Sequence, residues 1–300
     1  MQLAIATTKP FSFGQTLTFI RRFPPCQGDY VLTGDSLTGA VTVEGRAVPF
    51  TLRGTAELIV ETEAASVASR AADFVGANDD LTELYAAAEG DPPFRALVEQ
   101  LHGLHHVRFL TLEEIAVYSV MMQRTPIAAA SRMKRRFLEW FGLPVTVSSQ
   151  TLRAMPEFAA LVELEASAIG EAIGHRRKGE LIAGVVRGVA EIGEARLREA
   201  PYAEARDALL EVPGIGPFSA AAILLRGLGR MDELPAMRGL SDEARVIYGD
   251  TYDERAISTR YGRQIGYWAF YLKTGVSRLH PDPRRSGSGP RNTVRAKFAA

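Results

Sequence analysis

A short run with the sequence Pro-Gly-Ile-Gly-Pro, at residues 213–217, separates two stretches of helical periodicity. The first stretch covers residues 203–212, and the proline directly after it stops the helix. Pro217 suits the first position of a second helix, where its missing N–H group costs nothing. Apolar residues then follow the i, i+3, i+4, i+7 spacing of a buried helix face: Phe218, Ala221, Ala222 and Leu225. The run therefore predicts two helices, 203–212 and 217–228, joined by a tight turn.

The two glycines make this turn suitable for contact with a phosphate group. Gly214 and Gly216 carry no Cβ atom and can adopt positive φ angles, so the backbone can approach a ligand closely. The first N–H groups of the second helix, near Phe218 and Ser219, have no intrahelical acceptor and carry the positive end of the helix dipole. Ile215 would pack between the two helices and fix their angle. The alternative is a plain helix–turn–helix connection, which often contains glycine.

The rest of the chain indicates an α+β fold with two domains. Four short β-branched segments, at 30–32, 39–43, 48–52 and 57–61, predict an antiparallel sheet, and helical patterns follow at 65–75 and 94–101. We therefore expect residues 1–108 to form an N-terminal mixed α/β domain, with an antiparallel sheet plus helices. From about residue 110 the pattern is helical almost throughout, which predicts an all-helical domain at 109–280. Residues 281–300 have the composition of a flexible basic tail.

The expected helices of the second domain are separated by glycine and proline. They cover residues 112–123, 127–141, 157–169, 178–192, 203–212, 217–228 and 255–272.

The charge balance argues against a protein that coats nucleic acid without regard to sequence. Lysine plus arginine and aspartate plus glutamate both number 35, so the formal net charge is zero. Local basic runs occur at 21–22, 132–136, 175–178 and 284–297. Each is interpreted as a solvated helix face or a free terminus, with local basic patches as the alternative.

Several classes of site are not expected. Cys26 is the only cysteine, so an internal disulfide and an iron–sulfur cluster held by four cysteines are excluded. His102, His105 and His106 cluster in sequence, but no carboxylate or cysteine spacing completes a metal site. We expect no metal and no cofactor. The sequence shows neither a signal peptide nor a run of about 20 apolar residues, so a soluble, cytoplasmic monomer without membrane contact is expected.

The turn at 213–217 is accompanied by several other segments in a characteristic order and spacing. Together they make the chain resemble the helix-hairpin-helix base-excision DNA glycosylase superfamily, of the bacterial 3-methyladenine DNA glycosylase II type. The similarity covers roughly residues 9–275. The matching segments are the aromatic entry at 10–19, the Leu-Glu-Glu to Met-Gln-Arg-Thr stretch at 112–125, the basic run at 175–178, and the Arg-Tyr-Gly to Tyr-Trp-Ala-Phe-Tyr-Leu stretch at 260–272. The partner that this resemblance implies is double-stranded DNA with a damaged base, in a protein associated with the nucleoid.

The resemblance also implies roles for individual residues. Members of the family rotate a damaged nucleotide out of the duplex into an aromatic pocket. Gln123 and Arg124 correspond to the wedge that fills the vacated space, and Phe19 and Phe218 to pocket walls. The turn residues, Gly214 to Gly216 with Phe218 and Ser219, would bind the DNA backbone. Phe218 stands where strand-cutting members carry a lysine nucleophile, so a Schiff-base lyase mechanism is not expected.

One position departs from the family pattern. Monofunctional members place an aspartate shortly after a Leu-Pro pair, where its carboxylate stabilises the cationic sugar as the base leaves. Here Met237 occupies that position. Three interpretations stay open. Glu233, Asp232 or Asp242 could substitute; the enzyme could act only on labile cationic bases such as 3-methyladenine; or the protein could bind damaged or structured DNA without excision.

Overall fold

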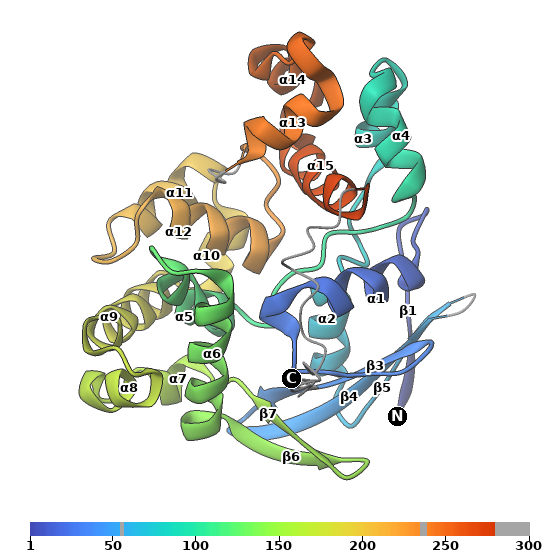
Figure 1. Cartoon of the computed structure of the whole chain (residues 1–300). Helices are drawn as coiled ribbons and strands as arrows, with labels where there is room; N and C mark the ends of the chain where they lie inside the picture. The colour runs from blue at the N-terminus through green and yellow to red at the C-terminus, as the bar shows by residue number, and fades with distance from the viewer. Residues whose placement is uncertain (55–56, 235–238, 280–300) are drawn as a thin grey trace, which may run out of the picture.

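The N-terminal part of the chain builds a five-stranded antiparallel sheet. The computed structural model describes residues 1–54, 57–234 and 239–279 (Figure 1). The sheet has the order β1-β5-β4-β3-β2. Its strands are β1 (Gln2–Ile5), β2 (Val31–Leu32), β3 (Ser36–Val43), β4 (Arg46–Gly54) and β5 (Leu58–Thr62). The four predicted strands are confirmed, and β1, which pairs with β5, was not anticipated.

Two helices and a tight turn complete this part. Helices α1 (Phe13–Arg22) and α2 (Ala65–Phe74) pack against the sheet, and a 3-10 turn, η1 (Pro24–Cys26), follows α1. The β3–β4 connection turns at Glu44 and Gly45, whose φ angles of 50° and 72° suit a two-residue hairpin. Sheet and helices enclose a shared core that includes Leu37, Phe50 and Val60.

The middle of the chain forms a helical layer around one buried helix. α5 (Leu112–Met122) is buried from Leu112 to Met121 and is surrounded by the other helices of this layer. These are α6 (Ile127–Phe141), α7 (Phe158–Leu161), α8 (Ala166–Ile173), α9 (Arg176–Ile192), α10 (Glu194–Glu199), α11 (Tyr202–Leu210) and α12 (Pro217–Ala222), which continues as a π-helical turn, η2 (Ile223–Gly227). The helix expected at 157–169 is in fact the two helices α7 and α8.

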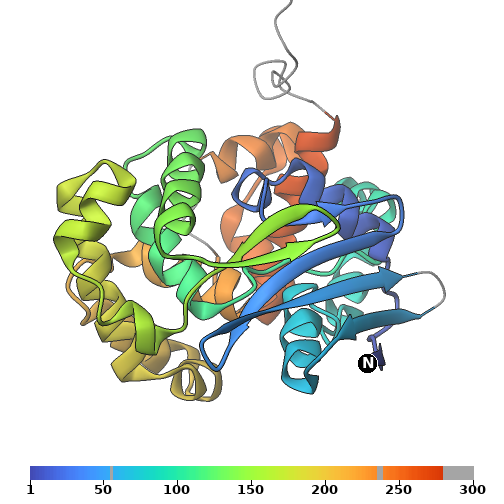
Figure 2. The same ribbon diagram turned by 90° about the horizontal axis from the view of Figure 1, so that it is seen from below.

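A β-hairpin interrupts this layer, and the expectation of an all-helical second domain was wrong at this point. Strands β6 (Leu143–Val147) and β7 (Gln150–Ala154) are joined by Ser148 and Ser149, whose φ angles are 48° and 68°. Seen from below, this hairpin lies against the large sheet (Figure 2). Leu152 and Ala154 pack there against Ala40. The fold class, a mixed α+β chain with an antiparallel sheet and many helices, is confirmed.

A third cluster joins distant parts of the sequence. Helices α3 (Thr82–Glu89) and α4 (Pro92–Gln100) pack with α13 (Leu240–Tyr248), η3 (Gly249–Thr251), α14 (Glu254–Tyr261), η4 (Gly262–Gln264) and α15 (Ile265–Leu279). The helix expected at 255–272 is broken at Gly262, which has a φ of 45°. Residues 81–104 share a core with residues 225–276, so this cluster contains parts of both predicted domains. The domain boundary at residue 108 stays a prediction. The predicted tail at 281–300 lies outside the described residues.

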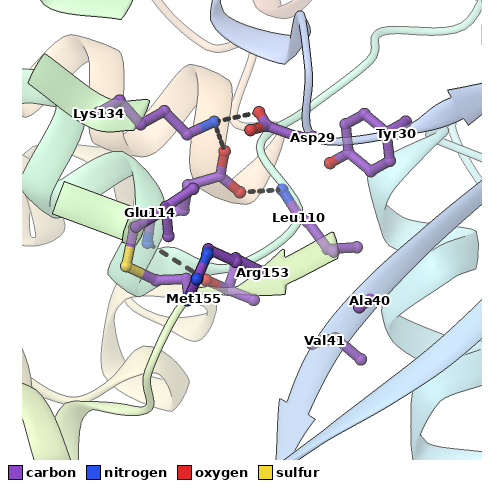
Figure 3. Close-up of a pocket in the computed structure, with 11 residues that line it drawn as sticks. Asp29, Tyr30, Ala40, Val41, Leu110, Glu114, Lys134, Arg153 and Met155 are labelled. Atoms are coloured by element: carbon purple, nitrogen blue, oxygen red, sulfur yellow. Dashed lines mark hydrogen bonds and ion pairs between the residues drawn. The ribbon is translucent and has the colours of Figure 1, made fainter. Parts of the chain in front are cut away.

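A buried lysine connects the segment between α1 and β2 to the helical layer. Lys134 of α6 is 3% exposed, and its ammonium group donates hydrogen bonds to Asp29 Oδ2 at 2.6 Å and to the Glu114 carboxylate (Figure 3). It also donates to the Pro25 carbonyl oxygen at 2.8 Å. Burial alone would lower the pKa of Lys134, but the Asp29 and Glu114 carboxylates outweigh it and raise that pKa. The basic run at 132–136 is therefore not only a solvated face. Within the described segments, no helix combines the length and the apolar character needed to cross a membrane.

We predict that replacing Lys134 by methionine lowers the free energy of unfolding by about 3–5 kcal/mol, because it leaves the buried carboxylates without a cation. Arg135→Met, on the exposed side of the same helix, is the matched control and should change stability by less than about 0.5 kcal/mol. Denaturant unfolding measures both. Equal, small losses for the two variants would contradict a role of this ion cluster in holding the two layers together.

Candidate functional site

The turn between α11 and α12 joins two helices as the sequence predicts, but only one of its two glycines has a positive φ. Gly214 has a φ of 98°, and a Cβ atom there would meet the side chains of Leu181 and Val185 at 3.1 and 3.3 Å. Ile215 is 6% exposed and packs into the core of the helical layer, as expected. Gly216 has an ordinary φ of −102°, and a Cβ atom built on it would meet nothing within 4 Å. Gly214 is therefore required by the turn, whereas Gly216 leaves open space in front of the backbone.

The start of α12 is uncapped and accessible. No side chain of the described residues caps it, and Pro217 holds its first position. The next two residues, Phe218 and Ser219, bring N–H groups that lack an acceptor within the helix. The Phe218 side chain is 42% exposed, whereas Ser219 is buried. This end of the helix presents backbone donors and a partial positive charge to a ligand from outside.

The turn after α5 is bound to this helix start. The Gln123 side-chain amide donates to the Gly214 carbonyl oxygen at 2.8 Å and to Ser219 Oγ at 3.1 Å. The structure thus brings together four of the residues that the sequence singles out: Gln123, Gly214, Gly216 and Ser219. Arg124, next in the chain, is exposed and has a φ of 51°, which is uncommon for a residue other than glycine. Of the two expected wedge residues, only Arg124 has a side chain that is free to project outward.

A lysine that the sequence analysis placed in a solvated run holds this turn. Lys178 of α9 is 6% exposed. Its ammonium group donates to the carbonyl oxygens of Val120, Met121 and Gln123 at 3.0, 2.6 and 3.0 Å, and to Thr125 Oγ1 at 2.8 Å. Burial lowers the pKa of Lys178. The ammonium group thus supplies hydrogen bonds to the last carbonyl groups of α5, and its positive charge complements the negative end of the α5 helix dipole.

The expected pocket walls are not brought together. Phe19 of α1 stacks on Phe23 at a ring-centroid distance of 5.2 Å and meets Phe270 of α15 edge-on, also at 5.2 Å. Phe218 lies instead on the exposed first turn of α12. Phe19 thus belongs to an aromatic cluster between α1 and α15, in which Phe218 takes no part.

The catalytic position is outside the described residues, because these omit Met237. The carboxylates that could replace the missing aspartate all lie near arginines. Glu233 accepts a hydrogen bond from Arg206 at 2.8 Å, and Asp232 lies 3.5 Å from Arg230. Asp242, with a side chain that is 86% exposed, lies 3.8 Å from Arg245. Each acid is therefore neutralised by a neighbouring cation or open to water.

The three clustered histidines face different partners. His102 stacks on Tyr85, and each ring nitrogen of His105 lies within hydrogen-bond distance of a backbone carbonyl oxygen, of Gly76 or of Pro10. Burial is the largest effect that lowers the pKa of His106 well below its usual value. In the segments that the structure describes, no three His, Cys, Asp or Glu side chains are grouped so that they could hold a metal ion.

Comparison with known proteins finds relatives that are similar in sequence and solved structures that share the fold. No protein-family model matches the sequence. The chain is 26% identical over 203 residues to a DNA-3-methyladenine glycosylase of Bacillus subtilis, covering 65% of this chain and 67% of the relative. Its fold matches a 3-methyladenine DNA-glycosylase from Archaeoglobus fulgidus with a TM-score of 0.77 at 21% identity, over 92% of this chain and 99% of the other.

A second solved structure is an 8-oxoguanine glycosylase/lyase of Clostridium acetobutylicum in complex with double-stranded DNA containing cytosine opposite 8-oxoguanine. The TM-score is 0.69 at 14% identity, over 93% of this chain and 98% of the other. The overall fold is thus shared with solved DNA glycosylases, and the sequence is similar to that of a protein with the same kind of name. Sequence similarity and a shared fold thus support the resemblance of this chain to helix-hairpin-helix DNA glycosylases of the bacterial 3-methyladenine type.

Proposed function

We propose that this protein binds duplex DNA through the turn between α11 and α12, rotates a damaged base out of the stack and hydrolyses its N-glycosidic bond without cutting the strand. The observation that carries the proposal is the accessible, uncapped start of α12, next to open space at Gly216 and bound by the Gln123 amide. Helix starts of this kind bind phosphate groups through backbone N–H donors.

The charge of the chain fits this mode of binding. With a net charge of zero, the protein has no overall positive charge that would attract DNA. Backbone donors supply phosphate contacts without side-chain charge, and such contacts set the position of a protein on the duplex without reading its sequence. Damage would then be recognised by the lower cost of removing a poorly paired base from the stack.

Arg124 is the residue we assign to the vacated space in the duplex. Two contacts hold the turn that carries Arg124. Lys178 donates to the last carbonyl groups of α5, and the Gln123 amide donates to the Gly214 carbonyl oxygen. The strained backbone of Arg124 therefore presents its side chain from a rigid support, beside the phosphate-binding turn. A rigid support limits the entropy that is lost when the side chain enters the duplex.

The chemistry proposed is monofunctional hydrolysis. Phe218 cannot form a Schiff base, so strand cleavage through an enzyme–sugar adduct is not part of the proposal. Hydrolysis requires that the positive charge developing on the sugar be tolerated or stabilised. The alkylated bases that the resemblance implies, which leave easily when cationic, stay a prediction.

A second function, binding of damaged DNA without excision, is favoured by one observation. Glu233 and Asp232, which flank the expected catalytic position, are paired with Arg206 and Arg230. A carboxylate held by an arginine is a poor source of negative charge for a sugar cation. In this alternative the DNA-binding turn works as described above, and the base is exposed but retained.

We predict that Gly216→Val weakens binding to damaged and undamaged duplexes alike, by about tenfold or more, because the valine side chain keeps phosphate away from the backbone donors. The site has an ordinary φ and open surroundings, so the fold should be unaffected. Gly34→Val, at another glycine with no neighbour within 4 Å, is the matched control. Affinity is measured against salt concentration. Unchanged affinity in a folded Gly216→Val protein would rule out this turn as the anchor.

We predict different effects for the two adjacent residues of the turn. Arg124→Ala should reduce the fluorescence change of 2-aminopurine beside an abasic site several-fold more than it reduces affinity, because the wedge is lost while the anchor remains. Gln123→Ala should reduce both signals together, because it removes two bonds that hold the hairpin. A parallel loss of both signals in Arg124→Ala would assign this residue to backbone contact.

A further inference from the structure

Basic residues gather on α6 and at the start of α9. The chain as a whole has equal numbers of acidic and basic residues, but the segments 124–141 and 174–178 together contain eight arginines and lysines and a single acid, Glu139. Two of the eight, Lys134 and Lys178, are buried and bind groups of the protein itself. The other six are exposed: Arg124, Arg132, Arg135, Arg136, Arg176 and Arg177.

The start of α9 lies beside α6. Helix α8 packs against α6 and leads into α9 (Figure 1). Arg136 Nη2 donates to the Glu171 carbonyl oxygen at 3.2 Å, and a Cβ atom on Gly174 would lie 2.9 Å from Arg136 Nη1, so this side chain covers the turn before α9. At the other end of α6, Lys178 donates to Thr125 Oγ1 at 2.8 Å. The first turn of α9 is therefore next to α6 and to the residue that precedes it by two positions.

Five of these arginines form one surface beside the proposed wedge, Arg124. On α6, Arg132 has as neighbours the two arginines that follow it by three and four residues. Because Arg136 covers the turn before α9, the two arginines that begin α9 lie next to this side of α6. We call the group the arginine surface; it consists of Arg132, Arg135, Arg136, Arg176 and Arg177.

The charge of the arginine surface is largely unneutralised. Within the described residues, Arg176 pairs with Glu180 at 3.1 Å, whereas the guanidinium groups of Arg132, Arg135 and Arg177 have no carboxylate partner. Cations three and four residues apart on one helix repel each other. Arg176 and Arg177 also stand in the first turn of α9, where the helix dipole disfavours positive charge. A bound polyanion would relieve both repulsions.

We propose that the arginine surface binds the phosphate backbone of the duplex beside the extruded base, as a second contact in addition to the hairpin. This inference rests on the proposed function, which places Arg124 in the duplex. The guanidinium groups pair with phosphate oxygens in charge-assisted hydrogen bonds. The basic runs at 132–136 and 175–178 thus include a local basic patch, the alternative that the sequence left open.

The two contacts differ in chemistry and therefore in what they contribute. At the hairpin, backbone N–H groups of α12 hold a phosphate in a fixed position next to the wedge. At the arginine surface, exposed side chains contact phosphates through their charge, and such contacts carry no sequence information. They act equally on damaged and undamaged DNA. The arginine surface thus supplies the salt-dependent, non-specific binding with which the protein scans a duplex, whereas the preference for damage stays with the wedge.

The test is the salt dependence of affinity for an abasic-site duplex and for the matched undamaged duplex. Each phosphate that an arginine neutralises contributes about −0.9 to the slope of log K against log salt concentration. A triple variant, Arg132→Gln with Arg135→Gln and Arg177→Gln, should have a slope less steep than that of the wild-type protein by about 2 to 3. Between 50 and 200 mM salt, the wild-type protein should therefore lose about fortyfold more affinity than this variant. The ratio of affinities for the two duplexes should stay the same.

Two control variants separate the arginine surface from net charge and from folding. Arg46→Gln with Arg196→Gln and Arg255→Gln removes three exposed arginines from β4, α10 and α14, and should keep the wild-type slope. Lysine in place of the three arginines of the test variant retains their charges and should keep the slope within about one unit. Thermal unfolding shows whether each variant is folded. Should the test variant be unfolded, its three single Gln substitutions decide, each with an expected change in slope of about 0.9.

The outcomes separate this inference from the proposed function. Equal slopes for the test variant and the wild-type protein would overturn the inference and leave binding by the hairpin in place. An equal reduction in the control with three other arginines would also overturn it, since net charge would then account for the effect. If Gly216→Val binds normally and the test variant has the flatter slope, the hairpin fails as the anchor and the arginine surface stands. If the wild-type protein binds neither duplex at any salt concentration, both proposals fail.

Discussion

Lys178 donates hydrogen bonds to three carbonyl oxygens at the end of α5 and to the Thr125 hydroxyl, and the DNA-binding surface proposed above depends on this one ammonium group. Without it, the end of a fully buried helix would leave its carbonyl groups unsatisfied. The Lys178 bonds hold the turn after α5 in place. From this turn the Gln123 side chain reaches the hairpin, and the Arg124 side chain is exposed. The hairpin and the wedge are thus parts of one rigid unit.

Two other buried cations, Lys134 and Arg226, have different kinds of neighbours. Lys134 is surrounded by Asp29, Glu114 and a carbonyl oxygen, so its charge is fully used within the protein and joins two layers. Arg226, by contrast, has aromatic rings, His106 Nε2 and one carbonyl oxygen as its neighbours, and no carboxylate pairs with it among the described residues.

Much of the fold and part of the site could be predicted from the sequence, because glycine and proline restrict the backbone independently of context. That restriction identified the hairpin around Gly214, and short β-branched segments between turns identified the central strands. The β6–β7 hairpin was missed because Ser148 and Ser149 make its turn in place of the usual Asn-Gly. Lys178 and Arg226 were missed for another reason: a basic residue in a helix gives no sign of which partner it will meet, and that is decided by tertiary packing.

In the function proposed above, the chain binds DNA and exposes a base but has Met237 where a cation-stabilising carboxylate is expected. Single-turnover release of the base from hypoxanthine-containing duplex by Met237→Asp tests it most directly. A well-placed carboxylate in a dehydrated site is worth about 3 kcal/mol, so we expect a gain of about a hundredfold over the wild-type rate. No gain, in a folded variant that binds the duplex as tightly as the wild-type protein, would contradict the claim.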